Sequence, residues 1–227
     1  MTDNPREHPP GTPKENNIWL TVTLAAVVLL SVAGTWIAIQ SQTKPLTLQD
    51  KVSVAVQALH SGYDQAAFAM LEPLATAGNP RAQYWLSNIY ENGEGRKPDR
   101  AAAIGWLEKA ASQSFRPAQR HLGELYLSGT EALQDFGKAR TWLEKAAISG
   151  DGMAERQLGQ IYALGLGVPV DPTKAYGWYE NATLHGDGLA RALRDDILKH
   201  MMPDEVAKGE LEAKTIAASI ETGKLSS

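Results

Sequence analysis

Histidines are the first side chains to consider as metal ligands or catalytic bases in this chain of 227 residues, which contains five of them and no cysteine. The five are His8, His60, His121, His185 and His200. No two of them lie three or four positions apart, the spacing at which one helix directs two imidazoles at a metal ion. The lack of cysteine excludes disulfide frameworks, thiolate zinc sites and a cysteine nucleophile. The sequence therefore predicts no metal site.

Two other features could support chemistry, and both have simpler explanations. The loop containing Gly165 and Gly167 lacks the downstream Lys and Ser or Thr of a phosphate-binding loop, so these glycines are interpreted as turn residues. Trp106, Trp142 and Trp178 could form a platform that stacks on sugars, but a large residue at a recurring internal position is typical of core packing. We therefore predict that the protein is not an enzyme and binds no cofactor.

Composition limits the classes of partner. The chain has 22 Lys and Arg against 26 Asp and Glu, a formal net charge of -4, so it offers no general basic surface for nucleic acid. Hydrophobic residues make up 43% of the sequence, enough for a packed core.

The most informative pattern is a repeat of 36 residues. The block WLEKAA at 106–111 recurs 36 residues later at 142–147, and a diverged copy starts at Trp178. A second block with the same period places three residues four apart, which aligns them along one face of a helix. Its copies are Ala82, Leu86 and Tyr90; Ala118, Leu122 and Tyr126; and Ala154, Leu158 and Tyr162. Both blocks predict buried helical faces.

Glycines and capping residues divide each repeat into a helix hairpin. Gly150 with Asp151, and Gly186 with Asp187, combine a helix-ending glycine with a residue that caps the next helix. One hairpin cannot bury its apolar face alone, so the hairpins must stack. We expect a helix pair over 48–60 and 63–77 before the repeats, and a closing helix over 203–221 after them.

These residues resemble the Sel1-like repeat, a relative of the tetratricopeptide repeat, over roughly residues 63–202. The first copy matches at Gly78, Asn79, Pro80, Arg81, Ala82, Gln83, Tyr84, Leu86, Ile89, Tyr90, Gly93, Gly95, Asp99, Ala102 and 106–110, and the third at Gly150, Gly165, Gly167, Val168, Asp171, Lys174, Ala175 and Trp178. The resemblance implies an all-α, right-handed α-solenoid that binds proteins as an adaptor, often in bacterial envelopes or signalling, without catalytic residues. The sequence departs from the pattern at Arg96, where the family usually has an aliphatic residue.

The amino-terminal region has the pattern of a membrane anchor. Residues 1–17 are polar and rich in proline, which predicts a disordered tail, and residues 18–39 contain no charged side chain. A helix over 18–39 would be roughly 33 Å long, enough to cross a hydrocarbon core of roughly 30 Å. Trp19 and Trp36 lie near its ends, where indoles favour the membrane interface. The alternative is a signal peptide cleaved before Gly34, after the small residues Ser31 and Ala33.

The predicted organisation has five parts: the tail, 1–17; one transmembrane helix, 18–39; a linker, 40–47; the solenoid, 48–202; and a closing helix with its tail, 203–227. Arg6 and Lys14 before the span balance Lys44 and Lys51 after it, so basic residues do not set the orientation. The short tail favours export of the larger domain. We expect a single-pass protein of a bacterial inner membrane with a periplasmic solenoid.

The predicted binding surface consists of polar positions that differ between repeats. In tetratricopeptide-like solenoids the first helix of each unit lines the inner surface, which makes six residues candidates for a groove that binds a partner peptide; an ordinary solvated face is the alternative. They are Tyr84, Asn88, Arg120, Glu124, Arg156 and Gln160. Arg120 and Arg156 are expected to lie side by side as a positive spot for a carboxylate.

The predicted function is a non-enzymatic, membrane-anchored adaptor or scaffold for protein partners. The alternative is an envelope accessory protein that binds peptidoglycan or another glycan.

Overall fold

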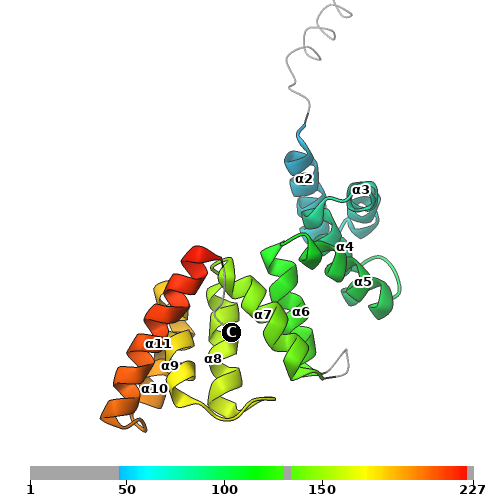
Figure 1. Ribbon diagram of the computed structural model, residues 1–227. Coiled ribbons are helices and arrows are strands. Elements are labelled where there is room, and N and C mark those ends of the chain that lie inside the picture. The colour runs from blue at the N-terminus through cyan, green and yellow to red at the C-terminus, as the bar shows by residue number, and fades with distance from the viewer. Residues whose placement is uncertain (1–45, 130–133, 224–227) are drawn as a thin grey trace, which may run out of the picture. The chain divides into compact units, whose positions relative to one another are not determined.

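A computed structural model describes residues 46–129 and 134–223 of the chain. Within these two ranges the chain forms ten helices and no strand, which confirms the predicted all-α class (Figure 1). The helices are α2 (Leu48–His60), α3 (Asp64–Thr76), α4 (Pro80–Asn92), α5 (Arg100–Ser112), α6 (Arg116–Ser128), α7 (Phe136–Ile148), α8 (Gly152–Leu164), α9 (Pro172–Leu184), α10 (Gly188–Leu198) and α11 (Pro203–Thr222).

The 36-residue period of the sequence is also the period of the helices. Helices α4, α6, α8 and α10 begin at residues 80, 116, 152 and 188, while α3, α5, α7 and α9 begin at 64, 100, 136 and 172. From α2 to α10 each helix packs against the next one in the chain, as a solenoid of hairpins requires. Equivalent residues of successive repeats therefore occupy equivalent places on neighbouring hairpins.

Short-range hydrogen bonds fix where the helices begin and end. The side chains of Asn79, Asp151, Asp171 and Asp187 accept backbone N–H groups at the starts of α4, α8, α9 and α10, as their sequence contexts predict. At the end of α8, Gly165 has a φ of 68°, a left-handed conformation that favours glycine. These boundaries are thus determined by residues that are close in sequence.

The predicted helical faces are buried. Leu86, Leu122 and Leu158 are at most 1% exposed, and their alanine partners in the same blocks are completely buried. A β-carbon built on Gly159 would lie 2.5 Å from the ring of Tyr179, so α8 and α9 can be this close only because residue 159 has no side chain. The core therefore lies between the two helices of each hairpin and between successive hairpins.

Helix α11 departs from the neighbour-to-neighbour order, because it packs against α9 and reaches α7 (Figure 1). It covers Trp178, which is only 5% exposed. Asn181 donates one hydrogen bond to the carbonyl of Gly177 and one to the carbonyl of Ala213 on α11, both 2.9 Å long. The closing helix therefore seals the outer face of the last full repeat.

In the two earlier repeats the equivalent tryptophans are covered differently. Trp106 and Trp142 are half-buried, and the ammonium groups of Lys109 and Lys145 lie 3.9 and 4.0 Å from their ring centroids. In the third repeat Asn181 stands at the position of this lysine, because α11 covers that position and would bury the charge of a lysine there. Cation–π contacts thus take the place of the closing helix on the first two repeats.

The predicted transmembrane segment, 18–39, and the predicted tail, 1–17, lie outside the described residues. None of the helices in the described part of the chain has the length and apolar character needed to cross a membrane.

Candidate functional site

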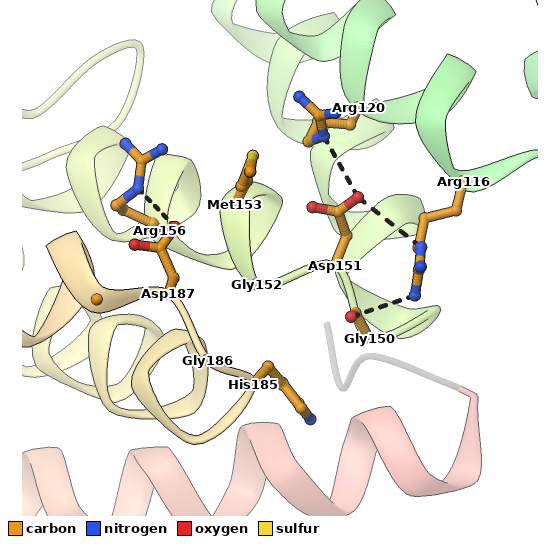
Figure 2. A pocket seen from close by; sticks show the side chains of 11 residues that line it. Arg116, Arg120, Gly150, Asp151, Gly152, Met153, Arg156, His185, Gly186 and Asp187 are labelled. Atoms are coloured by element: carbon orange, nitrogen blue, oxygen red, sulfur yellow. Dashed lines mark hydrogen bonds and ion pairs between the residues drawn. The ribbon is translucent and has the colours of Figure 1, made fainter. Parts of the chain in front are cut away.

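A cavity of about 510 Å³ opens on the face formed by α6 and α8 and by the turns that lead into α8 and α10 (Figure 2). Three arginines and two aspartates supply its charged groups. It is lined by Arg116, Arg120, Gly150, Asp151, Gly152, Met153, Arg156, His185, Gly186, Asp187 and Gly188. Two successive repeats contribute equivalent residues to the cavity, so its lining follows from the 36-residue repeat.

The floor of the cavity is the tripeptide Gly-Asp-Gly, present twice, at 150–152 and 186–188. In each copy the first glycine has a positive φ, 73° at Gly150 and 87° at Gly186, and ends the preceding turn. The aspartate then caps the next helix through Oδ1. A β-carbon at Gly150, Gly186 or Gly188 would meet no atom within 4 Å, so bare backbone faces open space there.

Each cavity aspartate also holds an arginine from the preceding inner helix. Arg120 Nε lies 3.3 Å from Asp151 Oδ2, in an ion pair without hydrogen-bond geometry, and Arg156 Nε donates to Asp187 Oδ2 over 2.8 Å. Burial opposes ionisation of Asp187, but the hydrogen bonds from Arg156 and from backbone N–H groups outweigh it and lower the pKa of that carboxyl. The two arginines that the sequence predicts to lie side by side are thus each paired with an aspartate.

Arg116, at the start of α6, adds a third guanidinium. Its terminal nitrogen donates to the carbonyl of Ser149 over 3.0 Å, while its Nε remains 3.9 Å from Asp151 Oδ2. Three arginines and two aspartates therefore line the cavity, and Glu124, outside the lining, pairs with Arg120 at 2.7 Å.

A buried acid lies behind the cavity wall. Glu155 on α8 is completely buried, and both of its carboxylate oxygens lie within 2.9 Å of His185 Nδ1. Burial raises the pKa of Glu155 although His185 lowers it, and Asp151 and Asp187 raise it further. In the other two repeats the same position is Gln83 or Gln119, whose amide donates to a carbonyl of the preceding helix.

The six predicted groove residues divide into three groups. Arg120 and Arg156 line the cavity together. Glu124 accepts hydrogen bonds from Arg120 Nη1 at 2.7 Å and from Gln157 Nε2 at 3.0 Å, so it braces the arginine from outside the lining. Tyr84, Asn88 and Gln160 do not line the cavity.

Tyr84 belongs to an aromatic cluster on the first repeat. Its ring centroid lies 5.6 Å from that of Phe115, 5.7 Å from that of Trp85 and 6.2 Å from that of His121. Tyr84 and Phe115 occupy the positions that Arg156 and Asp187 occupy two repeats later. The same contact between repeats is therefore aromatic at one end of the solenoid and ionic at the other.

Sequence reasoning did not select Arg116, Met153 or His185 for the site, and it assigned Asp151 and Asp187 only to helix caps. The available signal was the second Gly-Asp-Gly copy 36 residues after the first, at 186–188. In the described part of the chain, no cluster of three or more His, Asp or Glu side chains is arranged to hold a metal ion.

Comparison with known proteins identifies the repeat. The Sel1 repeat family matches residues 80–115, 116–151 and 152–187. A crystal structure of a Sel1 repeat protein from Oxalobacter formigenes is 36% identical, with a TM-score of 0.52, and the match covers 56% of this chain and 95% of that protein. A protective antigen of uropathogenic Escherichia coli with an SLR fold is 24% identical, with a TM-score of 0.51; the match covers 80% of this chain and 49% of the antigen.

No curated protein matches the chain. The helix register, the buried repeat positions and the match to the Oxalobacter protein lead to one assignment. The chain belongs to the Sel1 repeat proteins.

Proposed function

We propose that the protein is a non-enzymatic adaptor that binds a protein partner on the surface carried by α4, α6 and α8. Sel1 repeat proteins generally mediate protein–protein interactions, and this fold is typically a scaffold without catalysis. The observation that carries the proposal is the cavity on that surface, where two repeats present arginines held by helix-capping aspartates. A partner side chain inserted there would be anchored between successive repeats.

The chemistry of the cavity supports binding rather than catalysis. His185 and Glu155 resemble a base with its orienting acid, but no serine, threonine or cysteine is among the residues that line the cavity. A glycan partner is less well supported, because Lys109 and Lys145 already occupy ring faces of Trp106 and Trp142.

We also propose that residues 18–39 anchor the protein in a bacterial inner membrane, with the solenoid in the periplasm. The uncharged stretch and the tryptophans near its ends support this assignment. Carbonate extraction should leave the full chain in the membrane fraction, and alkaline phosphatase fused after Ser227 should be active. A mature amino terminus at Gly34 would contradict the anchor, and an inactive fusion would contradict the orientation.

The adaptor proposal is tested by purifying the full-length protein from its own cells in mild detergent and identifying the proteins that accompany it. Arg156→Gln removes a cavity guanidinium, and Arg140→Gln on α7 is the matched control because Arg140 does not line the cavity. We expect one reproducible partner that Arg156→Gln loses and Arg140→Gln retains. Equal recovery of the partner with both variants, or retention of the protein by purified cell-wall sacculi without any protein partner, would overturn the proposal.

A further inference from the structure

We infer that the cavity between α6, α8 and α10 is a carboxylate-binding site, in which the terminal nitrogens of Arg156 receive the ligand. The carboxylate would belong to the protein partner, so this inference rests on the proposed adaptor function. The binding chemistry itself belongs to this chain and can be measured without the partner.

The position of Arg156 is the first argument. Its Nε is held by Asp187 Oδ2 at 2.8 Å, and Figure 2 shows its two terminal nitrogens on the side away from Asp187. No side chain or carbonyl of the described residues accepts a hydrogen bond from either terminal nitrogen. The side chain is only 19% exposed, and the ion pair with Asp187 fixes the orientation of its guanidinium. A carboxylate can accept two parallel hydrogen bonds from such an edge.

The distribution of charge is the second argument. Arg120 pairs with both Asp151 and Glu124, at 3.3 and 2.7 Å, so two carboxylates neutralise its charge. Arg156 has Asp187 as its one acidic partner among the described residues, and Arg116 is bonded mainly to backbone carbonyls. Arg116 is therefore the lining arginine without a close acidic side chain, since its Nε lies 3.9 Å from Asp151 Oδ2, and its charge favours an anionic ligand.

Space is the third argument. A β-carbon at Gly186 or Gly188 would meet no atom within 4 Å, so a ligand can approach the cavity floor along bare backbone. Met153 lines the same cavity and is 51% exposed, which offers an apolar contact for the methylene groups that carry a carboxylate. A planar, two-oxygen ligand on a short aliphatic stem fits these surroundings.

Gly188 allows the charge of the cavity to be changed without touching any arginine. It is the first residue of α10 and does not have a positive φ, and Arg116 occupies the equivalent first position of α6, so a long side chain is compatible with this helix start. Gly188→Glu places a competing carboxylate in the cavity, whereas Gly188→Arg adds a cation at the same place. The two variants differ in the sign of the charge and share similar bulk.

The test uses the full-length protein in mild detergent, labelled with ¹⁵N, and follows the side-chain Nε resonance of Arg156, assigned by its loss in Arg156→Gln. Three peptides are titrated at constant ionic strength. Acetyl-Gly-Asp-Gly-amide carries a side-chain carboxylate, acetyl-Gly-Asn-Gly with a free carboxyl terminus carries a terminal one, and acetyl-Gly-Asn-Gly-amide carries none. The first two peptides distinguish the two sources of a carboxylate in a partner.

We expect a saturable shift of the Arg156 resonance with at least one carboxylate peptide and none with the uncharged peptide. Gly188→Glu should weaken that binding by about tenfold and Gly188→Arg should strengthen it, because like and opposite charges are then placed beside the ligand. Equal shifts with charged and uncharged peptides, no shift with any peptide, or equal affinities of the two Gly188 variants would overturn the inference. Loss of the cellular partner in Arg156→Gln without any peptide binding would leave the adaptor function standing and reject the carboxylate.

Discussion

Asp151 and Asp187 each use the two oxygens of one carboxylate for different purposes. Oδ1 of Asp187 accepts the backbone N–H groups of Leu189 and Ala190 at 3.0 Å, and Oδ2 accepts from Arg156 at 2.8 Å. The start of a helix and the orientation of a cavity arginine therefore depend on the same side chain. Mutation of such an aspartate should affect stability and binding together.

Asp187→Ala should lower the free energy of unfolding by more than Asp99→Ala does. Asp99 caps α5 by accepting one hydrogen bond from the backbone N–H of Ala102, and loss of such a cap is expected to cost about 1 kcal/mol. Asp187 is more buried and also neutralises Arg156, so its loss leaves a guanidinium without its acidic partner. Urea unfolding of a fragment beginning at Leu46 measures both variants. Equal costs would show that the ion pair adds nothing to the cap.

Glu155→Gln should stabilise the protein at neutral pH. The new amide can donate to the carbonyl of Ala147, as Gln83 donates to Ala75 and Gln119 to Ala111. Because burial raises the pKa of Glu155 above its ordinary value of 4.5, the wild type holds this proton more tightly when folded than when unfolded. Its stability should therefore fall, relative to the variant, as the pH rises from 4.5 through the raised pKa.

The measurement for this prediction is the urea midpoint of wild type and Glu155→Gln at pH 4.5, 6 and 8. We expect the advantage of the variant to grow with pH and to reach about 1 kcal/mol or more at pH 8, since a buried carboxylate is replaced by a hydrogen-bonded amide. Asp151, Asp187 and His185 are present near residue 155 in both proteins, so the two proteins differ in ionisable side chains only at that residue. An advantage that shrinks as the pH rises would contradict the assignment.

Arg96 departs from the family pattern and is exposed, yet its guanidinium contacts two aromatic rings. Its guanidinium carbon lies 4.2 Å from the ring centroid of Phe68 and 4.1 Å from that of Tyr90. Val168, the equivalent residue of the third repeat, packs in the same cluster as Tyr162. The sequence identified the departure but could not supply its reason, because Phe68 belongs to an earlier hairpin.

At the scale of helices, the recurring glycines differ sharply in what surrounds them. Gly159 on α8 faces the ring of Tyr179, whereas a β-carbon on Gly105 of α5 would meet no atom within 4 Å. Both lie inside helices, where glycine is less favourable than alanine by roughly 0.5 to 1 kcal/mol. The same substitution should therefore have opposite effects at the two positions.

We expect Gly105→Ala to raise the urea midpoint and Gly159→Ala to lower it. At Gly159 the added methyl group overlaps the Tyr179 ring at 2.5 Å, and overpacking of this kind typically costs about 1 to 3 kcal/mol. The pair is measured in the same fragment under the same conditions. If both substitutions stabilise the protein, α8 and α9 are free to move apart and the close approach is not required.

Helix boundaries could be predicted from the sequence because their determinants are local: a glycine, a capping aspartate and a buried stripe lie within one repeat. The candidate site could be predicted only in part, because its contacts span 31 residues and join successive repeats. Arg120 and Arg156 were predicted because they lie on a polar helical stripe that differs between repeats, while the buried positions recur. The role of Asp187 in holding Arg156 was missed, because its capping function already explained its presence.

At the scale of the whole described unit, α11 is a terminal helix whose removal should lower stability strongly. Truncation after Met202 would uncover Trp178, which is 5% exposed, and would remove the carbonyl of Ala213 that accepts from Asn181. Exposure of the tryptophan alone should cost about 3 kcal/mol. We expect a lower urea midpoint and a tendency to aggregate. Unchanged stability of the shorter chain would show that α11 is dispensable for the fold.

The contacts of α11 also make the two ends of the solenoid differ in their expected resistance to mechanical force. Helix α11 packs against α9 and also contacts α7, so it links the last two full repeats, whereas among the described helices the hairpin of α2 and α3 packs only against α4. If force were applied between the proposed anchor and a partner bound in the cavity, α2 and α3 would carry it, because they lie between the two along the chain. The hairpin of α2 and α3 would then unfold and lengthen first, while the partner stays bound in the cavity.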